Sequence, residues 1–325
     1  MKAIKFFAIS AMAAAMITSC STDDELSQSN YPSDNIIRVT AGVNNAKTRA
    51  EGAGTEMKKD FSLTIVNKNA PKYTYTDKVF SKTSGDWACS ETLLWQKSDA
   101  LVDIVAFAPA QTGKFNGVYA EGSIQPITYS VASDQSTASD KNDLLYYYTK
   151  DFNPGKSLVD KKLNIQFNHA FCMIDIVVTL GTEFNKPSIP TTSPIVKVTL
   201  GGTKIAANVD VTNAASVVTA SETADATTIT TTNGTFTTAA NAEANAISRF
   251  SCIAIPQKVG ANTFKVSLMT AGKLYEWTSA EPVELKSGYR YTLNLSMGND
   301  VVLLKGGSIT ATKWTEVSGG SLETD

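Results

Sequence analysis

One histidine and four cysteines are the residues of this 325-residue sequence whose types could support catalysis, metal binding or redox chemistry. His169 would have to serve in any Ser/His/Asp or Cys/His device, and a site with several histidine ligands is excluded. It shares an apolar face with Ile165, Phe167 and Phe171, which favours a hydrogen-bonded structural histidine. No CxxC, HExxH, GxSxG or phosphate-binding glycine loop is present. We therefore expect a protein that is not an enzyme and that uses no cofactor or metal.

Cys20 follows the features of an export signal. Two lysines stand within the first five residues, an apolar run covers residues 6–17, and small residues lead to Ser19. About a dozen apolar residues is too short for a membrane-spanning helix, which needs roughly 20. The segment resembles the lipobox of bacterial lipoproteins, which implies cleavage between Ser19 and Cys20 and acylation of Cys20 by a fatty acid such as palmitate. The alternative is an ordinary secretory signal in which Cys20 is incidental.

The residues after Cys20 indicate where the protein would be held. Residues 20–35 are polar and suit a lipidated tether behind the signal peptide of residues 1–19. The acidic run 23–25 resembles the surface-export signal of some Gram-negative lipoproteins. We therefore expect a surface-exposed lipoprotein of the outer membrane, bound through the lipid on Cys20.

Composition and patterning predict an all-β protein. The formal net charge is −2 and no basic face is visible, which argues against a nucleic-acid partner. Short apolar–polar alternations are separated by Gly, Pro, Asn and Asp, and the length favours more than one domain. We expect two consecutive β-sandwich domains, over residues 36–160 and 161–325, with the boundary in a turn-rich connector.

The first strand is predicted over residues 36–43. Its apolar face consists of Ile37, Val39, Ala41 and Val43. A small, polar, glycine-containing loop follows over residues 44–56, the composition of a segment open to proteolysis. The chain has four arginines, and Arg49 is the one that falls in such a loop.

In the second half, the pattern predicts a long strand over 163–180 with a bulge or bend near residue 170. Thr-rich segments on both sides of Asn233-Gly234 predict a hairpin over 226–238. Pairing of Cys172 with Cys252 is left open. The expected core of the second sandwich, with His169 at or near it, is Phe167, Phe171, Ile174, Ile176, Phe264, Val266, Leu268, Tyr291 and Leu293.

Several of these features occur in an order that resembles the fimbrillin family of lipoprotein-derived (type V) pilins. The pieces are a lipobox cysteine, Thr-Arg-Ala after the first strand, and the segments 143–146, 167–170, 255–257, 285–293 and 309–314. The resemblance implies two transthyretin-like Greek-key sandwiches, cutting by an arginine-specific protease between Arg49 and Ala50, and polymerisation by donor-strand exchange.

The resemblance also implies partners: the protease, and other fimbrial subunits in a pilus that supports cell adhesion. Loss of the first strand would expose an apolar groove that another strand must fill. Residues 301–304 are apolar on both faces, which fits equally a fully buried place in their own sheet or in a neighbour's groove. If the tail 301–314 of a neighbour is the donor, its Gly306-Gly307 would let it swing away. Its apolar residues are Val301, Val302, Leu303, Leu304, Ile309 and Trp314.

Two alternatives stay open at this stage. One is a fimbrial tip or anchor subunit that keeps its first strand or its lipid. The other is a surface lipoprotein that binds glycans through exposed aromatic residues, with Trp87, Trp95 and residues 146–148 as candidates.

Overall fold

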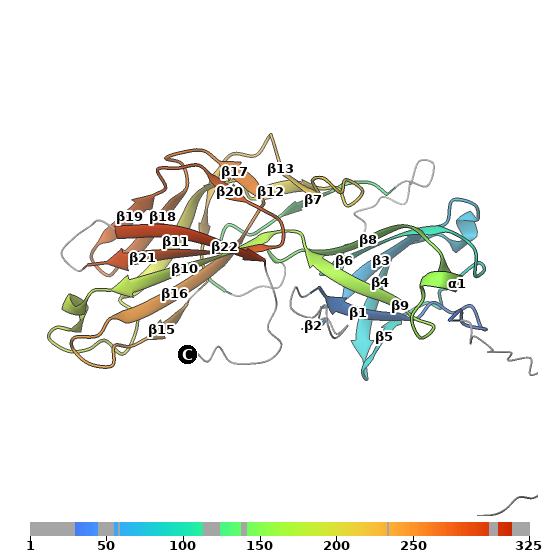
Figure 1. Cartoon of the computed structure of the whole chain (residues 1–325), viewed down its shortest axis with the longest axis horizontal. Helices are drawn as coiled ribbons and strands as arrows, with labels where there is room; N and C mark the ends of the chain where they lie inside the picture. Colours follow the sequence, from blue (N-terminus) through green and yellow to red (C-terminus); the bar gives the residue numbers. More distant parts are fainter. Residues whose placement is uncertain are drawn as a thin grey trace, which may run out of the picture.

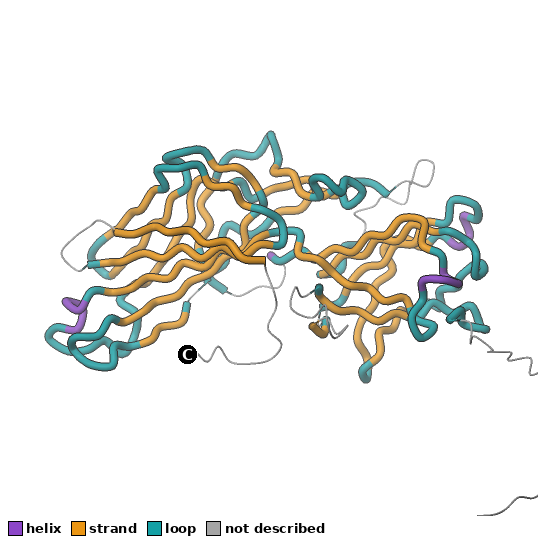
Figure 2. The backbone as a smooth tube through the Cα atoms, in the orientation of Figure 1, coloured by secondary structure: helices purple, strands orange, loops and turns teal. Residues whose placement is uncertain are grey.

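The computed structural model describes residues 30–44, 55–57, 59–112, 124–137, 142–232, 234–298 and 305–313. Within these residues, β-strands form five sheets and the helical segments are short. The helical segments are η1 (Pro71–Tyr73), α1 (Pro154–Ser157) and η4 (Thr182–Asn185). Figures 1 and 2 show two lobes side by side, each built from strands. The predicted all-β sandwich fold is confirmed, whereas its Greek-key connectivity stays a prediction.

The first lobe is one eight-stranded sheet and the core that it encloses. In order across the sheet, its strands are β2 (Thr55–Glu56), β1 (Val39–Val43), β9 (Leu163–His169), β8 (Leu145–Phe152), β6 (Val102–Ala108), β3 (Phe61–Val66), β4 (Tyr75–Thr83) and β5 (Asp86–Cys89). β1 runs parallel to β9 and antiparallel to β2, and the other neighbours are antiparallel. The β1–β9 pair therefore joins strands that are far apart in the sequence.

The residues just before β1 close the first lobe on its other side. Ile37 N donates to Leu93 O at 2.9 Å, and Trp95 N donates to Asn35 O at 2.8 Å. One continuous segment thus pairs first with the chain that follows β5 and then with β9. Since backbone groups buried without partners are costly, the segment stabilises the lobe by supplying partners both to the chain after β5 and to β9.

The second lobe contains the other four sheets. A five-stranded sheet has the order β15 (Thr235–Thr237), β16 (Ala246–Ala254), β10 (Cys172–Leu180), β21 (Tyr289–Met297) and β22 (Lys305–Lys313). A four-stranded sheet has the order β14 (Thr227–Thr230), β11 (Ile195–Thr203), β18 (Lys265–Thr270) and β19 (Leu274–Thr278). A three-stranded sheet has the order β13 (Val218–Ala220), β12 (Ala206–Val209) and β7 (Ile127–Ser130). A two-stranded sheet pairs β17 (Gln257–Val259) with β20 (Val283–Leu285). One core of alternating apolar residues lies between the two large sheets.

The chain crosses between the lobes at places that differ from the expected boundary between residues 160 and 161. β9 lies after that boundary but belongs to the first sheet, and β7 lies before it but pairs with β12 of the second lobe. The predicted long strand 163–180 is therefore two strands in different sheets. The phase change near residue 170 marks the passage from one sheet to the next, not a bulge within one strand.

Placing β9 in the first lobe corrects one expected core residue. Phe167 is buried in the first lobe, against Phe61 at 5.5 Å between ring centroids. The remaining expected residues are buried in the second-lobe core: Phe171, Ile174, Ile176, Phe264, Val266, Leu268, Tyr291 and Leu293. The sequence thus predicts correctly that Phe167 points inward from β9, but it assigns this residue to the wrong lobe.

The predicted Asn-Gly hairpin is also wrong. β14 pairs with β11 and β15 pairs with β16, so the two Thr-rich segments lie in different sheets. Gly234 is needed for a close approach, because a Cβ there would fall 1.3 Å from the carbonyl oxygen of Arg249. Asn233 lies outside the described residues.

Candidate functional site

The first strand and the groove that holds it form the site to which the sequence points. β1 pairs with β9 over five positions, from Val39 opposite Leu163 to Val43 opposite Phe167. The ladder extends beyond β1, where Asn44 N donates to Phe167 O at 2.7 Å. Parallel pairing of this length holds the segment by its backbone, whatever its sequence.

The inner face of the segment supplies apolar surface to the first-lobe core. Ile37, Val39 and Val43 are buried, and Ala41 is half-buried against the same core. The predicted alternation matches the burial of Ile37, Val39 and Val43, whereas Gly42, on the opposite face, is buried as well. Without the segment, the inward side chains of β9 and those of Leu93 and Trp95 would be more exposed to solvent, because they share one core with it.

The outer face of the same strand carries a polar row. Thr40 Oγ1 donates to Asn164 Oδ1 at 3.3 Å, and Asn44 Nδ2 donates to Asn168 Oδ1 at 2.9 Å. Between these pairs, Gly42 lies opposite Gln166. Gln166 Nε2 instead donates to Asn164 Oδ1 at 2.7 Å. Sequence reasoning missed these amides, because nothing local shows that residues 124 positions apart lie side by side.

An ion pair stands at the beginning of this segment. Arg38 Nη2 lies 2.6 Å from Asp34 Oδ2, and Ile36 N donates to Asp34 Oδ1 at 3.0 Å. The hydrogen bonds from Arg38 and then from the Ile36 backbone lower the pKa of the Asp34 carboxyl to about 2. Both charged groups are exposed to solvent, so the pair contributes little stability.

The strand predicted as a donor, β22, forms an edge of the second lobe. It pairs antiparallel with β21, with Leu293 opposite Ile309 and Tyr289 opposite Lys313. Ile309 is half-buried against the core, whereas Ser308 and the residues 310–313 are exposed. Val301, Val302, Leu303, Leu304 and Trp314 lie outside the described residues, so their role stays a prediction.

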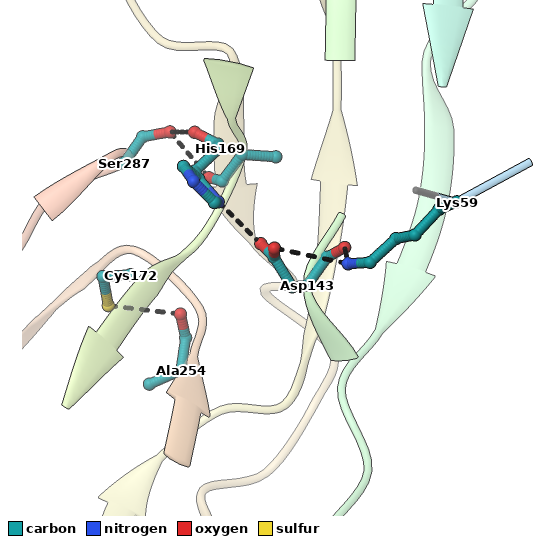
Figure 3. Close-up of polar contacts among 7 residues, drawn as sticks. Lys59, Asp143, His169, Cys172, Ala254 and Ser287 are labelled. Carbon is teal, nitrogen blue, oxygen red and sulfur yellow. Dashed lines mark hydrogen bonds and ion pairs between the residues drawn. The ribbon is translucent and has the colours of Figure 1, made fainter. Parts of the chain in front are cut away.

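The predicted structural role of His169 agrees with its position at the crossing between the lobes. His169 Nδ1 lies 2.9 Å from Asp143 Oδ1, and the histidine side chain is 2% exposed. Lys59 Nζ lies 3.5 Å from Asp143 Oδ2, and Ser287 Oγ donates to the carbonyl oxygen of His169 at 3.1 Å (Figure 3). The cluster thus joins both lobes at the point where β9 ends.

An open cleft of about 960 Å³ lies beside this crossing. Asn44 and Asn168, from the ends of β1 and β9, line one part of it. The second lobe supplies Lys258, Lys286 and Lys313. The end of the first strand and the end of β22 therefore line the same cleft.

The second-lobe cysteines are free thiols. Cys172 Sγ donates to Ala254 O at 3.2 Å (Figure 3), and Cys252 lies on the neighbouring strand opposite Ile174. Burial raises the pKa of the Cys172 thiol above its usual range and that of the Cys252 thiol to about 12. Such thiols are poor nucleophiles and pack as small apolar residues.

The aromatic residues considered for glycan binding do not form an exposed row. Trp95 is buried in the first-lobe core and stacks on Phe152 at 5.9 Å, and Trp87 packs on Phe61 at 4.8 Å. Tyrosines 146–148 are half-buried. Trp95 therefore belongs to the core, and Trp87 and the three tyrosines are partly covered by packing.

The processing residues predicted from the sequence lie outside the described residues. Ser19 and Cys20 precede residue 30, and Arg49 and Ala50 lie between residues 44 and 55. Among the described residues, no cluster of His, Cys, Asp and Glu could hold a metal ion. In the same part of the chain, no helix has the length and apolar character needed to cross a membrane.

The described chain is all-β and has two lobes, and its candidate site is a strand held in a groove. The family model described as fimbrillin-like matches residues 48–314, so the chain belongs to the fimbrillin-like family. This is a family of fimbrial and cell-adhesion proteins. Membership indicates a place in surface fimbriae and association with other fimbrial subunits.

Solved structures share this fold at low sequence identity. A fimbrial protein from Bacteroides vulgatus matches with a TM-score of 0.56 at 17% identity, covering 86% of this chain and 99% of that one. A protein from Bacteroides ovatus that is described as a cell-adhesion protein matches with a TM-score of 0.59 at 15% identity, covering 88% of this chain and 99% of that one. A similarly named Bacteroides uniformis protein gives 0.54 at 14% identity, covering 87% and 99%. No curated protein matches this chain.

Proposed function

We propose that this chain is a structural subunit of a fimbria, exported as a lipoprotein, cut after Arg49 and polymerised by strand exchange. The observation that carries the proposal is the arrangement of the first strand. It closes the first lobe with an apolar inner face, pairs with β9 and with the chain after β5, and ends directly before the loop that contains Arg49. One cut in that loop would separate the strand covalently from the lobe that it completes.

Two further features support processing at this place. The fimbrillin-like match begins at residue 48, beside the proposed cut. The chain upstream of Arg49 also contains Cys20, the proposed lipid attachment site. Cutting between Arg49 and Ala50 would therefore free the subunit from the lipid anchor and from the first strand, which both lie on the N-terminal fragment.

After the cut, holding the strand becomes a bimolecular equilibrium, and a strand from another subunit can compete for the groove. The proposed donor is the segment 301–314. In the isolated subunit β22 lies at a sheet edge with mostly exposed side chains, so one flank of hydrogen bonds holds it. Transfer into a neighbour's groove would supply pairing partners on both sides.

The proposal is tested with the purified full-length protein and an arginine-specific protease. Wild-type protein should be cut at Arg49 and should then form end-to-end polymers. Arg49→Ala should stay uncut and monomeric, whereas the matched control Lys47→Ala, in the same loop, should be cut and polymerise like wild type. Cut protein that stays monomeric at high concentration would overturn the shaft-subunit role and favour a tip or anchor subunit.

The donor assignment has a separate test. Deletion of residues 301–325 should leave cutting at Arg49 unchanged and abolish polymer growth. Polymers formed by the deleted protein would exclude the tail as the donor without affecting the proposed processing.

A further inference from the structure

The apolar face of the first strand does not by itself fix how a strand sits in the groove. Side chains alternate with a period of two, so a slip by one residue would turn the apolar face outward. A slip by two residues keeps the apolar face inward and preserves backbone pairing. The outward side chains are a feature that can distinguish the observed register from its two-residue neighbours.

The polar row on the outer face makes this distinction. In the observed register, Thr40 meets Asn164, Gly42 meets Gln166 and Asn44 meets Asn168. A slip by two residues in one direction brings Gly42 opposite Asn168. A slip in the other direction brings it opposite Asn164. In either case one of the two asparagines faces glycine, which has no side chain to offer, and loses its side-chain hydrogen bond; in the observed register both asparagines keep theirs.

We propose that Asn164 and Asn168 set the register of the strand in this groove and thereby select the strand that can occupy it. This inference rests on the proposed function, in which the groove accepts a strand from another subunit. The partner is an extended segment, parallel to β9, with hydroxyl or amide side chains at two outward positions four residues apart. The outward residue between them is small, as Gly42 is.

Asn164 and Asn168 are placed where they can set the register of the strand that pairs with β9. Both lie on the exposed face of β9, while the inward residues between them, Ile165 and Phe167, are buried. Asn164 is held in place by Gln166, whose Nε2 donates to it at 2.7 Å. Removing them would leave the apolar groove intact, so the effect on register can be separated from an effect on folding.

The test follows exchange of a labelled peptide into the cut protein. A peptide spanning residues 30–49 is added in excess to full-length protein cut at Arg49, and its affinity is compared with that of a Thr40→Val/Asn44→Val peptide. The double change removes two neutral hydrogen bonds and should weaken binding by about fivefold to a hundredfold. The matched control peptide, Arg38→Gln, changes an outward residue whose side chain bonds Asp34 of the same peptide, and should bind nearly as wild type.

Register is read by disulfide crosslinking to a Lys162→Cys variant in a Cys89→Ser background. Residue 38 precedes Val39, which lies opposite Leu163, so residue 38 should face residue 162. A peptide with Arg38→Cys reports the observed register, and one with Ile36→Cys reports a two-residue slip. When Asn164 and Asn168 are present, the Arg38→Cys peptide should give a much higher crosslink yield than the Ile36→Cys peptide. In the Asn164→Ala/Asn168→Ala variant, the yield from the Ile36→Cys peptide should rise until the two yields are comparable.

The outcomes separate the inference from the proposed function. An unchanged crosslink ratio in the double alanine variant would overturn the inference alone, because the inner side chains would then hold the register. Failure of the wild-type peptide to enter the cut protein would overturn strand exchange, and the inference with it.

Discussion

Cutting the chain at Arg49 should make the stability of the first lobe depend on protein concentration. The segment before the cut buries Ile37, Val39 and Val43 in the first-lobe core. At about 1.5–3 kcal/mol for each fully buried side chain, the three contribute roughly 5–9 kcal/mol. That is comparable to the whole stability of a typical domain, about 5–15 kcal/mol, so a lobe without this strand would be marginal.

Before the cut, the covalent link keeps the strand at an effective concentration on the order of millimolar. After the cut, unfolding of the lobe releases a free peptide, so each tenfold dilution removes about 1.4 kcal/mol of stabilisation. For a lobe of roughly a hundred residues, this corresponds to a fall in melting temperature of about 5–10 °C per tenfold dilution.

Calorimetry at three tenfold-spaced concentrations measures this effect. The first-lobe transition should shift with concentration in the cut protein, and it should stay constant in Arg49→Ala treated with the same protease. The second-lobe transition should stay constant in both. A concentration-independent first-lobe transition after complete cutting would show that the lobe does not need this strand, and would refute the reasoning.

Three further predictions follow from particular residues. Phe167→Ala should destabilise the first lobe by about 3–5 kcal/mol in chemical denaturation and leave the second-lobe transition unchanged, and a loss confined to the second lobe would contradict its assignment. Alkylation at pH 8 should label Cys89, which is partly exposed, and should spare Cys172 and Cys252 until denaturant is added, as counted by mass spectrometry. The pKa of Asp34, about 2 in the folded chain against an ordinary 3.8, means that its ion pair stabilises the strand above about pH 4 and loses this contribution as the pH falls toward 2. Because both groups are exposed, this contribution is small, and retention of the cut strand should change only slightly over that range. A large loss of retention that Asp34→Asn abolishes would contradict the small weight given to this pair.

Local pattern predicted the strands of this chain well where one face is buried. The alternation of Ile37, Val39 and Val43 identified both the strand and its inward face, and the apolar setting of His169 indicated a buried structural role. These features depend on periodicity, which is read from neighbouring residues. The candidate site could be located in the same way, as a strand followed by a loop with an arginine.

Pairing between distant strands could not be read in this way. The passage between β9 and β10 produced a phase change that a bulge would also produce, and only the pairing partners separate the two explanations. The Asn-Gly pair suggested a hairpin, but Gly234 serves a close approach to β16. The amides Asn164 and Asn168 acquire their meaning only when β1 lies beside β9.

The N-terminal residue of the protein recovered from assembled surface fimbriae tests the account most directly. The sequence places Ala50 directly after Arg49, and the account predicts that mass spectrometry will find subunits beginning at Ala50, without the first strand and without lipid. Uncut protein retained in the membrane fraction should begin at acylated Cys20. Fimbrial subunits that begin at Cys20 and keep the strand of residues 36–43 would contradict processing at Arg49 and the exchange that depends on it.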